Sequence, residues 1–435
     1  MSPSCAIALA PLDLAGLGPD EACAAIAAVH AAAARRGAAL LILAAGALPP
    51  GEALQGQLAA LSAPPGPDLL LGAADRVLLF EGGALRASRE VGAASATMPG
   101  PIAWRNRRLG VLAGAAGEGP DAAETLAETG AECLIWLHRI PFAPDAAERR
   151  LQTALARVVE TRLPLLALGP YGLESEAVFD GDAFALDHDR RLIFRANGEA
   201  ALSLLSWREA GWTATAPLPA EPLAEAALWA ALRLGLARAV ARGRYPGIVL
   251  ALDAGLADLL LALLAIVALG TARVRALVRD GAGQAQAAAL GIAAHAIDPA
   301  PAAAALGDVL RAPLNGRWGE AQAEPLAGRL DALLLVSLAE AFGDLALSPA
   351  DAAALARGAA TAGCFAPFKT LSPASLARLA AWQAEAAPGP LADALLTARL
   401  PSPAAPRPGQ RRAAPLWPAP PGLALVPAAP TGFFP

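Results

Sequence analysis

Lysine is almost absent from this chain of 435 residues, which contains only Lys369. Because arginine supplies every other permanently positive side chain, no reaction that needs two lysines is available. Cysteine is also scarce, and the four cysteines form no Cys-x-x-Cys pair. Together with four scattered histidines, this spacing argues against a disulfide framework and predicts no metal site.

Aromatic residues make up 5% of the chain, and its net charge is −5. A weakly acidic chain has no general attraction for nucleic acid or anionic lipid, so we expect neither as a partner. Residues 1–13 carry no basic group ahead of their apolar run, unlike a secretory signal, and we expect a cytoplasmic location. The most apolar stretch, residues 248–270, contains Asp253 and Asp258, which favours a buried strand and helix over a membrane span.

The length exceeds that of one ordinary core and predicts two domains. We place the first in residues 1–210 and the second in residues 244–400, with a linker and helix in residues 211–243 between them. Residues 401–435 are rich in Pro and Ala, which predicts an irregular tail.

Apolar runs alternate with Ala-rich helical patterns in both domains, which is typical of a layered α/β fold. In the first domain a helix is predicted over residues 20–36. The predicted strands there are residues 6–10, 39–44, 76–80, 109–113, 133–137, 165–168, 183–187 and 192–195. Around and within the second domain, strands are predicted over residues 247–252 and 274–278, and helices over residues 224–242, 257–269 and 326–342.

A specific resemblance lies between residues 141 and 187. The runs PFAPDAAERR and VVETRLPLLALGPYGLESEAVFDGDAFALD resemble the late part of the nitrilase-like domain of glutamine-dependent NAD+ synthetases. In that family an ETGLP turn precedes a VFDG hairpin. The resemblance implies an N-terminal nitrilase-like (carbon-nitrogen hydrolase) α-β-β-α sandwich, followed by a Rossmann-like ATP-pyrophosphatase domain.

Amidases of the nitrilase superfamily hydrolyse glutamine with a cysteine nucleophile, a glutamate base and a lysine that stabilises the oxyanion. The resemblance places Ala45 of GAALLILAAG in the glutamate slot and Gly114 of GVLAGAAGEGP in the cysteine slot. The segment GALRASREVGAAS, where the lysine is expected, contains none. Arg86 or Arg89 could replace only the lysine's charge.

Cys133 is the alternative nucleophile. It begins a predicted buried strand, where a cysteine commonly packs as a small apolar residue. We therefore predict that the first domain has no catalytic residues.

The second resemblance begins at residue 247, where GIVLALDAGLADLL resembles the ATP-pyrophosphatase signature GVVLGLSGGIDSAL. Such a loop binds phosphate through glycine amides, serine hydroxyls and a helix N-terminus. Carboxylates in place of the hydroxyls would repel pyrophosphate unless a metal intervened. Against the family pattern, Asp253 and Asp258 replace two serines, Ala254 replaces a glycine, Ala257 replaces an aspartate, and Gly255 is kept.

Other family motifs in the second domain are also depleted of polar residues. The resemblance places Ala352 and Ala354 where a nucleotide-binding lysine and glutamate belong. Glu324, Arg329 and Lys369 match family positions and are the candidate nucleotide-binding remnants. Each has a plain alternative: a surface lysine in a loop for Lys369, and a polar pair at a helix start for the other two.

Three functions remain open from the sequence. The first is a catalytically inactive family member that forms a homo- or hetero-oligomer, with an active NAD+ synthetase as the expected partner. The second is residual ATP-dependent amidation of nicotinic acid adenine dinucleotide with ammonia, and only this function would require ATP and Mg2+ as cofactors. The third is a module that binds another small ligand in the old cleft.

Overall fold

The computed structural model divides the chain into two compact units, Met1–Pro222 and Leu223–Pro435. It describes residues 5–45, 52–73, 76–90, 100–175, 177–198, 202–208, 211–214, 217–253, 255–311, 313, 320–356, 359, 363–386 and 395. The predicted tail over residues 401–435 lies outside the described residues.

The first unit contains a seven-stranded sheet with the order β15-β14-β1-β2-β3-β4-β5. Its strands β1, β2 and β3 run parallel, and the strands on either side of them are antiparallel. The bounds are β1 (Cys5–Leu12), β2 (Leu40–Ala45), β3 (Asp68–Gly72), β4 (Arg76–Glu81), β5 (Ala84–Glu90), β14 (Ser203–Arg208) and β15 (Gly211–Thr213).

A six-stranded sheet in the same unit has the order β13-β12-β9-β8-β7-β6 and a parallel centre of β7, β8 and β9. The hairpin of β10 (Tyr171–Glu174) and β11 (Ala177–Asp180) stands apart from both sheets. The six strands are β6 (Ile102–Trp104), β7 (Arg107–Ala113), β8 (Cys133–Leu137), β9 (Leu165–Leu168), β12 (Ala183–Leu186) and β13 (Leu192–Ala196).

Side-chain alternation along the strands builds the layers of this unit. Leu40 and Ile42 of β2 belong to a core that also contains Ile135 of β8, so this core lies between the two sheets. Leu41 and Leu43 belong instead to the core beneath the helices. Both faces of β2 are thus covered, which explains its unbroken apolar sequence.

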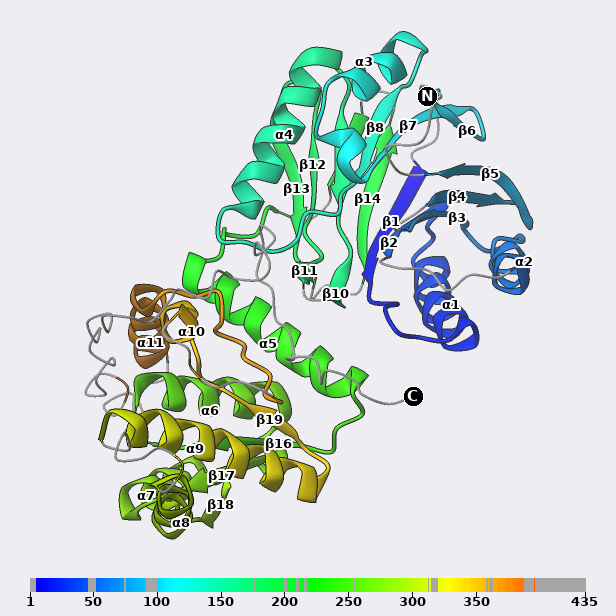
Figure 1. Ribbon diagram of the computed structural model, residues 1–435. Coiled ribbons are helices and arrows are strands. Elements are labelled where there is room, and N and C mark those ends of the chain that lie inside the picture. The colour runs from blue at the N-terminus through cyan, green and yellow to red at the C-terminus, as the bar shows by residue number, and fades with distance from the viewer. Residues whose placement is uncertain are drawn as a thin grey trace. The chain divides into compact units, whose positions relative to one another are not determined.

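Two helices cover the outer face of each sheet (Figure 1). Helices α1 (Pro19–Arg35) and α2 (Glu52–Leu61) pack on the seven-stranded sheet, and α3 (Asp121–Glu128) and α4 (Ala146–Thr161) pack on the six-stranded one. This is the α-β-β-α sandwich that the resemblance predicted.

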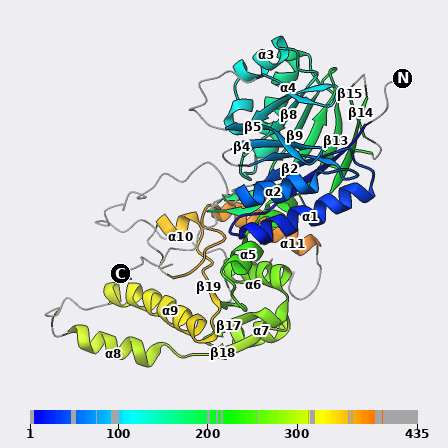
Figure 2. The same ribbon diagram turned by 90° about the vertical axis from the view of Figure 1, so that its right-hand side faces the viewer.

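The second unit contains a four-stranded, fully parallel sheet with the order β18-β17-β16-β19. Val249 and Leu277 pack with Leu335 and Ala339 of α9 on one face. Helix α6 packs against β16 and β17 and lies alongside α5, and Figure 2 shows α8 alongside α9. The bounds are α5 (Ala224–Arg242), β16 (Ile248–Ala251), α6 (Leu256–Leu269), β17 (Val274–Val278), α7 (Gly281–Leu290), β18 (Ala293–Ala296), α8 (Ala300–Arg311), α9 (Glu320–Phe342), β19 (Leu345–Leu347), α10 (Ala352–Ala356) and α11 (Pro373–Ala386).

The apolar stretch over residues 248–270 forms the predicted strand and helix, β16 and α6. Of the helices in the described part of the chain, none is long and apolar enough to cross a bilayer. The predicted strands over residues 133–137 and 165–168 match β8 and β9. Strands β5 and β6 were not predicted, because β5 has the partly exposed sequence ALRASRE and β6 has three residues.

Gly117 provides a test of the packing in the first unit. It ends a short 3-10 helix, η1 (Gly114–Gly117), and a Cβ added there would overlap the indole of the fully buried Trp136. We expect Gly117→Ala to lower the free energy of unfolding by about 1 to 3 kcal/mol, the usual cost of overpacking. Gly119→Ala is the control, since its Cβ would meet nothing within 4 Å. Equal urea-unfolding curves for the two variants would contradict this packing.

Candidate functional site

The two amidase slots lie at the carboxyl ends of strands from the two facing sheets. Ala45 is the last residue of β2 and is 2% exposed. Gly114 directly follows β7 and has a φ of +55°, a conformation that glycine adopts easily. Leu137, the last residue of β8, pairs with the end of β7 and contacts Gly72, which pairs with the end of β2. These contacts bring the strand ends of both sheets together.

An ion pair lies in this region. Arg139, two residues after β8, pairs with Glu174 of the hairpin, and its Nη1 donates to the Ala45 carbonyl oxygen over 3.5 Å. The guanidinium also lies over the Phe179 ring, 5.4 Å from its centre. Arg139 and Glu174 were missed from the sequence, although a position just beyond a parallel strand is a signal for such a residue.

A second polar group beside this region is buried. His138 is 1% exposed, and its Nε2 lies 3.4 Å from the Asp182 carbonyl oxygen. Burial, aided by the nearby Arg150 charge, lowers the pKa of His138 to about 3. The imidazole is therefore neutral and a very weak base, unsuited to replace the missing glutamate.

Arg150 itself is held by carboxylates. It is 1% exposed and makes two hydrogen bonds to Asp180, of 2.7 and 2.6 Å, which tie α4 to the hairpin. Burial opposes its charge, but the Asp180 carboxylate more than offsets this effect and the pKa of Arg150 rises. This bidentate pair anchors α4 to the hairpin, and the Arg150 Nε lies 3.4 Å from Asp182 Oδ2.

Cys133 does not lie near the slots. It begins β8 opposite Leu109, whereas Gly114 follows the other end of the β7–β8 ladder. Four residues of strand separate Cys133 from Leu137, roughly 13 Å at about 3.3 Å per residue. Cys133 is fully buried, and this burial raises its thiol pKa well above the usual value. Its position and protonation both exclude it as a nucleophile.

In the second unit, the altered pyrophosphate loop joins β16 to α6. Gly255 caps α6, and Asp258 is the third residue of the helix. A backbone hydrogen bond from Gly255 reaches the Asp258 carboxylate. A helix N-terminus normally offers its free amides to an anion such as phosphate. Here the protein's own carboxylate takes that place, while Ala254 lies outside the described residues.

Arg279 holds the loop from the neighbouring strand end. It follows β17 and forms two hydrogen bonds with Asp253, one of them 3.1 Å from Nε to Oδ1. Its Nη1 donates to Asp331 of α9 over 3.0 Å. The hydrogen bond to Asp253 raises the pKa of Arg279, while burial raises that of Asp331. Arg279 was missed from the sequence, although it stands one residue beyond a predicted strand.

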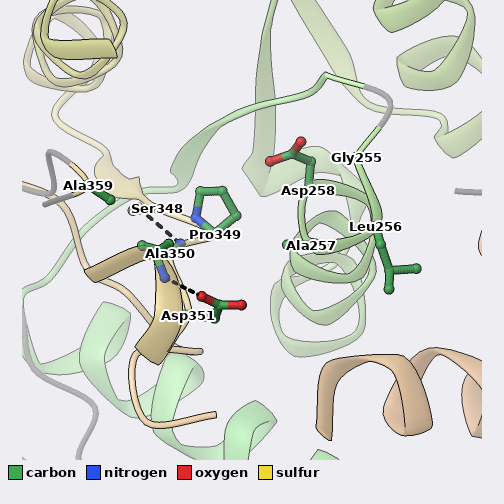
Figure 3. A pocket seen from close by; sticks show the side chains of 10 residues that line it. Gly255, Leu256, Ala257, Asp258, Ser348, Pro349, Ala350, Asp351 and Ala359 are labelled. Atoms are coloured by element: carbon green, nitrogen blue, oxygen red, sulfur yellow. Dashed lines mark hydrogen bonds between the residues drawn. The ribbon is translucent and has the colours of Figure 1, made fainter. Parts of the chain in front are cut away.

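A cavity of about 440 Å³ opens between the start of α6 and the segment after β19. Figure 3 shows Asp258 and Asp351 extending from these two walls toward each other. Burial, reinforced by the charge of Asp253, raises the pKa of Asp258 to about 8. The residues that line the cavity are Gly255, Leu256, Ala257, Asp258, Ser348, Pro349, Ala350, Asp351, Ala354 and Ala359.

Of the candidate remnants, Gly255 lines this cavity, whereas Arg329 and Lys369 are not among its described lining residues. Glu324 and Arg329 both lie in α9, and Arg329 is exposed. Lys369 lies in a turn that follows the bridge between Leu347 and Phe365. The described lining thus brings together Gly255, Ala257 and Asp258 of the loop, without Arg329 or Lys369.

The pKa of Asp258 predicts a pH-dependent stability. Between pH 4 and 8 the folded state keeps a proton that the unfolded state has lost, so stability falls as pH rises and levels off above pH 8. The free energy of unfolding falls by at most about 1.4 kcal/mol per pH unit, and contact of the carboxyl group with solvent reduces this slope. We expect Asp258→Asn to be more stabilising, relative to the native chain, at pH 8 than at pH 5.

Urea unfolding at both pH values measures this difference. Asp308→Asn is the matched control, because that carboxylate is 69% exposed on α8. The same gain at both pH values would contradict the raised pKa of Asp258.

Two curated relatives, each described as a glutamine-dependent NAD(+) synthetase, match the sequence, whereas no family model does. The protein from Rhodobacter capsulatus is 29% identical over 270 residues, which is 58% of this chain and 49% of the relative. The protein from Acinetobacter baylyi is 24% identical over 251 residues, 54% and 46% of the two chains. The matched part therefore spans about half the length of these relatives.

Solved structures extend the likeness to the whole fold. A glutamine-dependent NAD+ synthetase from Acinetobacter baumannii, solved with ADP, has a TM-score of 0.81 at 18% identity and covers 92% of this chain and 86% of that one. The corresponding synthetase from Cytophaga hutchinsonii has a TM-score of 0.67 at 14% identity and covers 87% and 81%. The sequence matches and the shared fold agree: in both of its units this chain resembles members of the glutamine-dependent NAD+ synthetase family.

Proposed function

We propose that this chain is a catalytically inactive member of its family and acts as a structural or regulatory partner of an active glutamine-dependent NAD+ synthetase. One observation carries the proposal. At each of the two sites the chain's own side chains satisfy the groups that a substrate would use: Arg139 with Glu174 beside Ala45, and Asp258 at the start of α6.

The amidase half lacks the means to break an amide bond. Ala45 and Gly114 offer neither base nor nucleophile, and Lys369, the sole lysine, lies in the other unit. The two candidates for replacement are His138, a neutral buried imidazole, and the remote Cys133, a buried thiol whose pKa is raised. Loss of one such group commonly costs a factor of about 100 to 1,000 or more in rate, and here all three are absent.

The synthetase half is poorly suited to ATP. The cavity presents Asp258 and Asp351, and none of its described lining residues is basic. Arg279, the closest cation of the loop, is engaged by Asp253 and Asp331. Mg2+ could relieve the repulsion, but the described residues contain no group of three metal-ligating side chains.

The intact scaffold favours a partner role over a decaying gene product. Loss of a core side chain typically costs about 2 to 5 kcal/mol, while a whole domain is stable by only about 5 to 15 kcal/mol. A chain free of selection would soon lose its apolar cores. Both units retain apolar cores, which supports selection for the folded chain.

The loss of both reactions is tested with purified protein. We expect no release of glutamate from glutamine, and no NAD+ from nicotinic acid adenine dinucleotide, ATP and Mg2+ with either glutamine or ammonia. An active synthetase assayed in parallel is the control. Glutamate release would overturn the amidase argument, and NAD+ formed with ammonia alone would favour the residual amidation reaction instead.

The partner role is tested by co-expression with the active synthetase of the same cell. We expect one mixed particle in size-exclusion chromatography with light scattering, and a change in the synthetase's kcat or its glutamine requirement. Separate particles, with synthetase kinetics unaltered by this chain, would contradict the proposal.

A further inference from the structure

The cavity beside α6 is large enough for a small molecule. Its volume of about 440 Å³ lies within the range of about 300 to 1,000 Å³ that ligand pockets occupy. One wall is the first turn of α6, and the other is the segment from Ser348 to Asp351 that follows β19 (Figure 3). Both walls belong to the second unit and stand at the carboxyl ends of its parallel strands.

The polar groups on the two walls are carboxylates. Asp258 extends from α6, and Asp351 extends from the opposite wall (Figure 3). Each is fixed by the backbone: Gly255 donates to Asp258, and the Ala354 amide donates to Asp351 Oδ1 over 2.6 Å. Because these bonds hold both side chains in place, the acidic groups of the cavity are preorganised.

The remainder of the lining is mainly apolar. Leu256 and Ala257 contribute from α6, and Pro349 and Ala350 from the facing segment. Such a surface favours the hydrocarbon stem of a ligand, because removing that stem from water stabilises the complex.

The charge of the lining side chains determines which class of ligand the cavity suits. A phosphate or carboxylate would meet two acids and no basic side chain among the described lining residues. A bare divalent cation would need more oxygen ligands than the site provides, and the described chain holds no cluster of three ligating side chains. An ammonium group on an apolar stem matches both the acids and the apolar walls.

We propose that this cavity binds a small organic amine in its ammonium form, with the nitrogen between Asp258 and Asp351 and the stem against the apolar wall. The proposal goes beyond the partner role and does not depend on it. Failure to form a mixed particle with an active synthetase would refute that role without affecting amine binding.

Proton release is an expected signature of this binding. The empty site holds a proton on Asp258, whose pKa is about 8, and an ammonium beside it favours the ionised form. The charged groups that face Asp258 are Asp253 from the loop and Arg279 from the end of β17, and Asp331 of α9 acts through Arg279. Affinity should therefore rise between pH 6 and 8, below the amine's own pKa of about 10.

Titration calorimetry on the full chain tests the proposal with 2-phenylethylamine and n-butylamine. The neutral probe is 2-phenylethanol, the anionic probes are 3-phenylpropionate and ADP, and Mg2+ is titrated alone. We expect the amines to bind more tightly at pH 8 than at pH 6. The neutral and anionic probes should bind at least about tenfold more weakly than the amines, because they lack the charge-assisted hydrogen bond.

Variants locate the site. Asp258→Asn and Asp351→Asn should each weaken amine binding by about tenfold or more, and Asp308→Asn should leave it unchanged. Circular dichroism verifies that each variant is folded, since asparagine can still accept the backbone hydrogen bonds. Absence of amine binding, equal binding of the alcohol, tight binding of ADP or Mg2+ alone, or full affinity in both variants would overturn the proposal.

Discussion

Parallel pairing of the central strands is the constraint on which both sites depend. Parallel strands deliver their carboxyl ends to one edge of a sheet, and loops that follow neighbouring strands therefore meet there. In the first unit one such edge gathers Gly114 and Arg139, and Ala45 meets them from the corresponding edge of the facing sheet. In the second unit such an edge gathers Asp253 and Arg279. The scaffold still presents two converging sets of loops, whatever residues those loops carry.

The residues at these edges satisfy one another. The Arg139–Glu174 pair lies beside the carbonyl of Ala45, and Asp258 accepts from the first turn of α6. Buried polar groups without partners are costly, so a site that has lost its substrate groups remains stable only if internal partners replace them. The fold and the proposed absence of chemistry follow from the same contacts.

Strongly apolar elements could be predicted from the sequence because both of their faces are covered. Strand β8, Cys133–Leu137, and helix α6, Leu256–Leu269, are examples, and the motifs around them predicted the two-unit α/β fold. Edge strands such as β5 carry polar side chains and pair only through backbone, so their sequence gives little signal. Arg139 and Glu174 were missed because they lie 35 residues apart in the sequence and meet only in the folded chain.

The sequence by itself determined which residue types stand at the candidate positions: an alanine and a glycine at residues 45 and 114, two aspartates at residues 253 and 258, and a single lysine in the whole chain. Only the tertiary structure decided what surrounds these positions. Which acid faces a cavity, which arginine is already paired, and which thiol is buried depend on distances between segments remote in sequence. Local composition does not encode those distances, because strand pairing and layer packing set them.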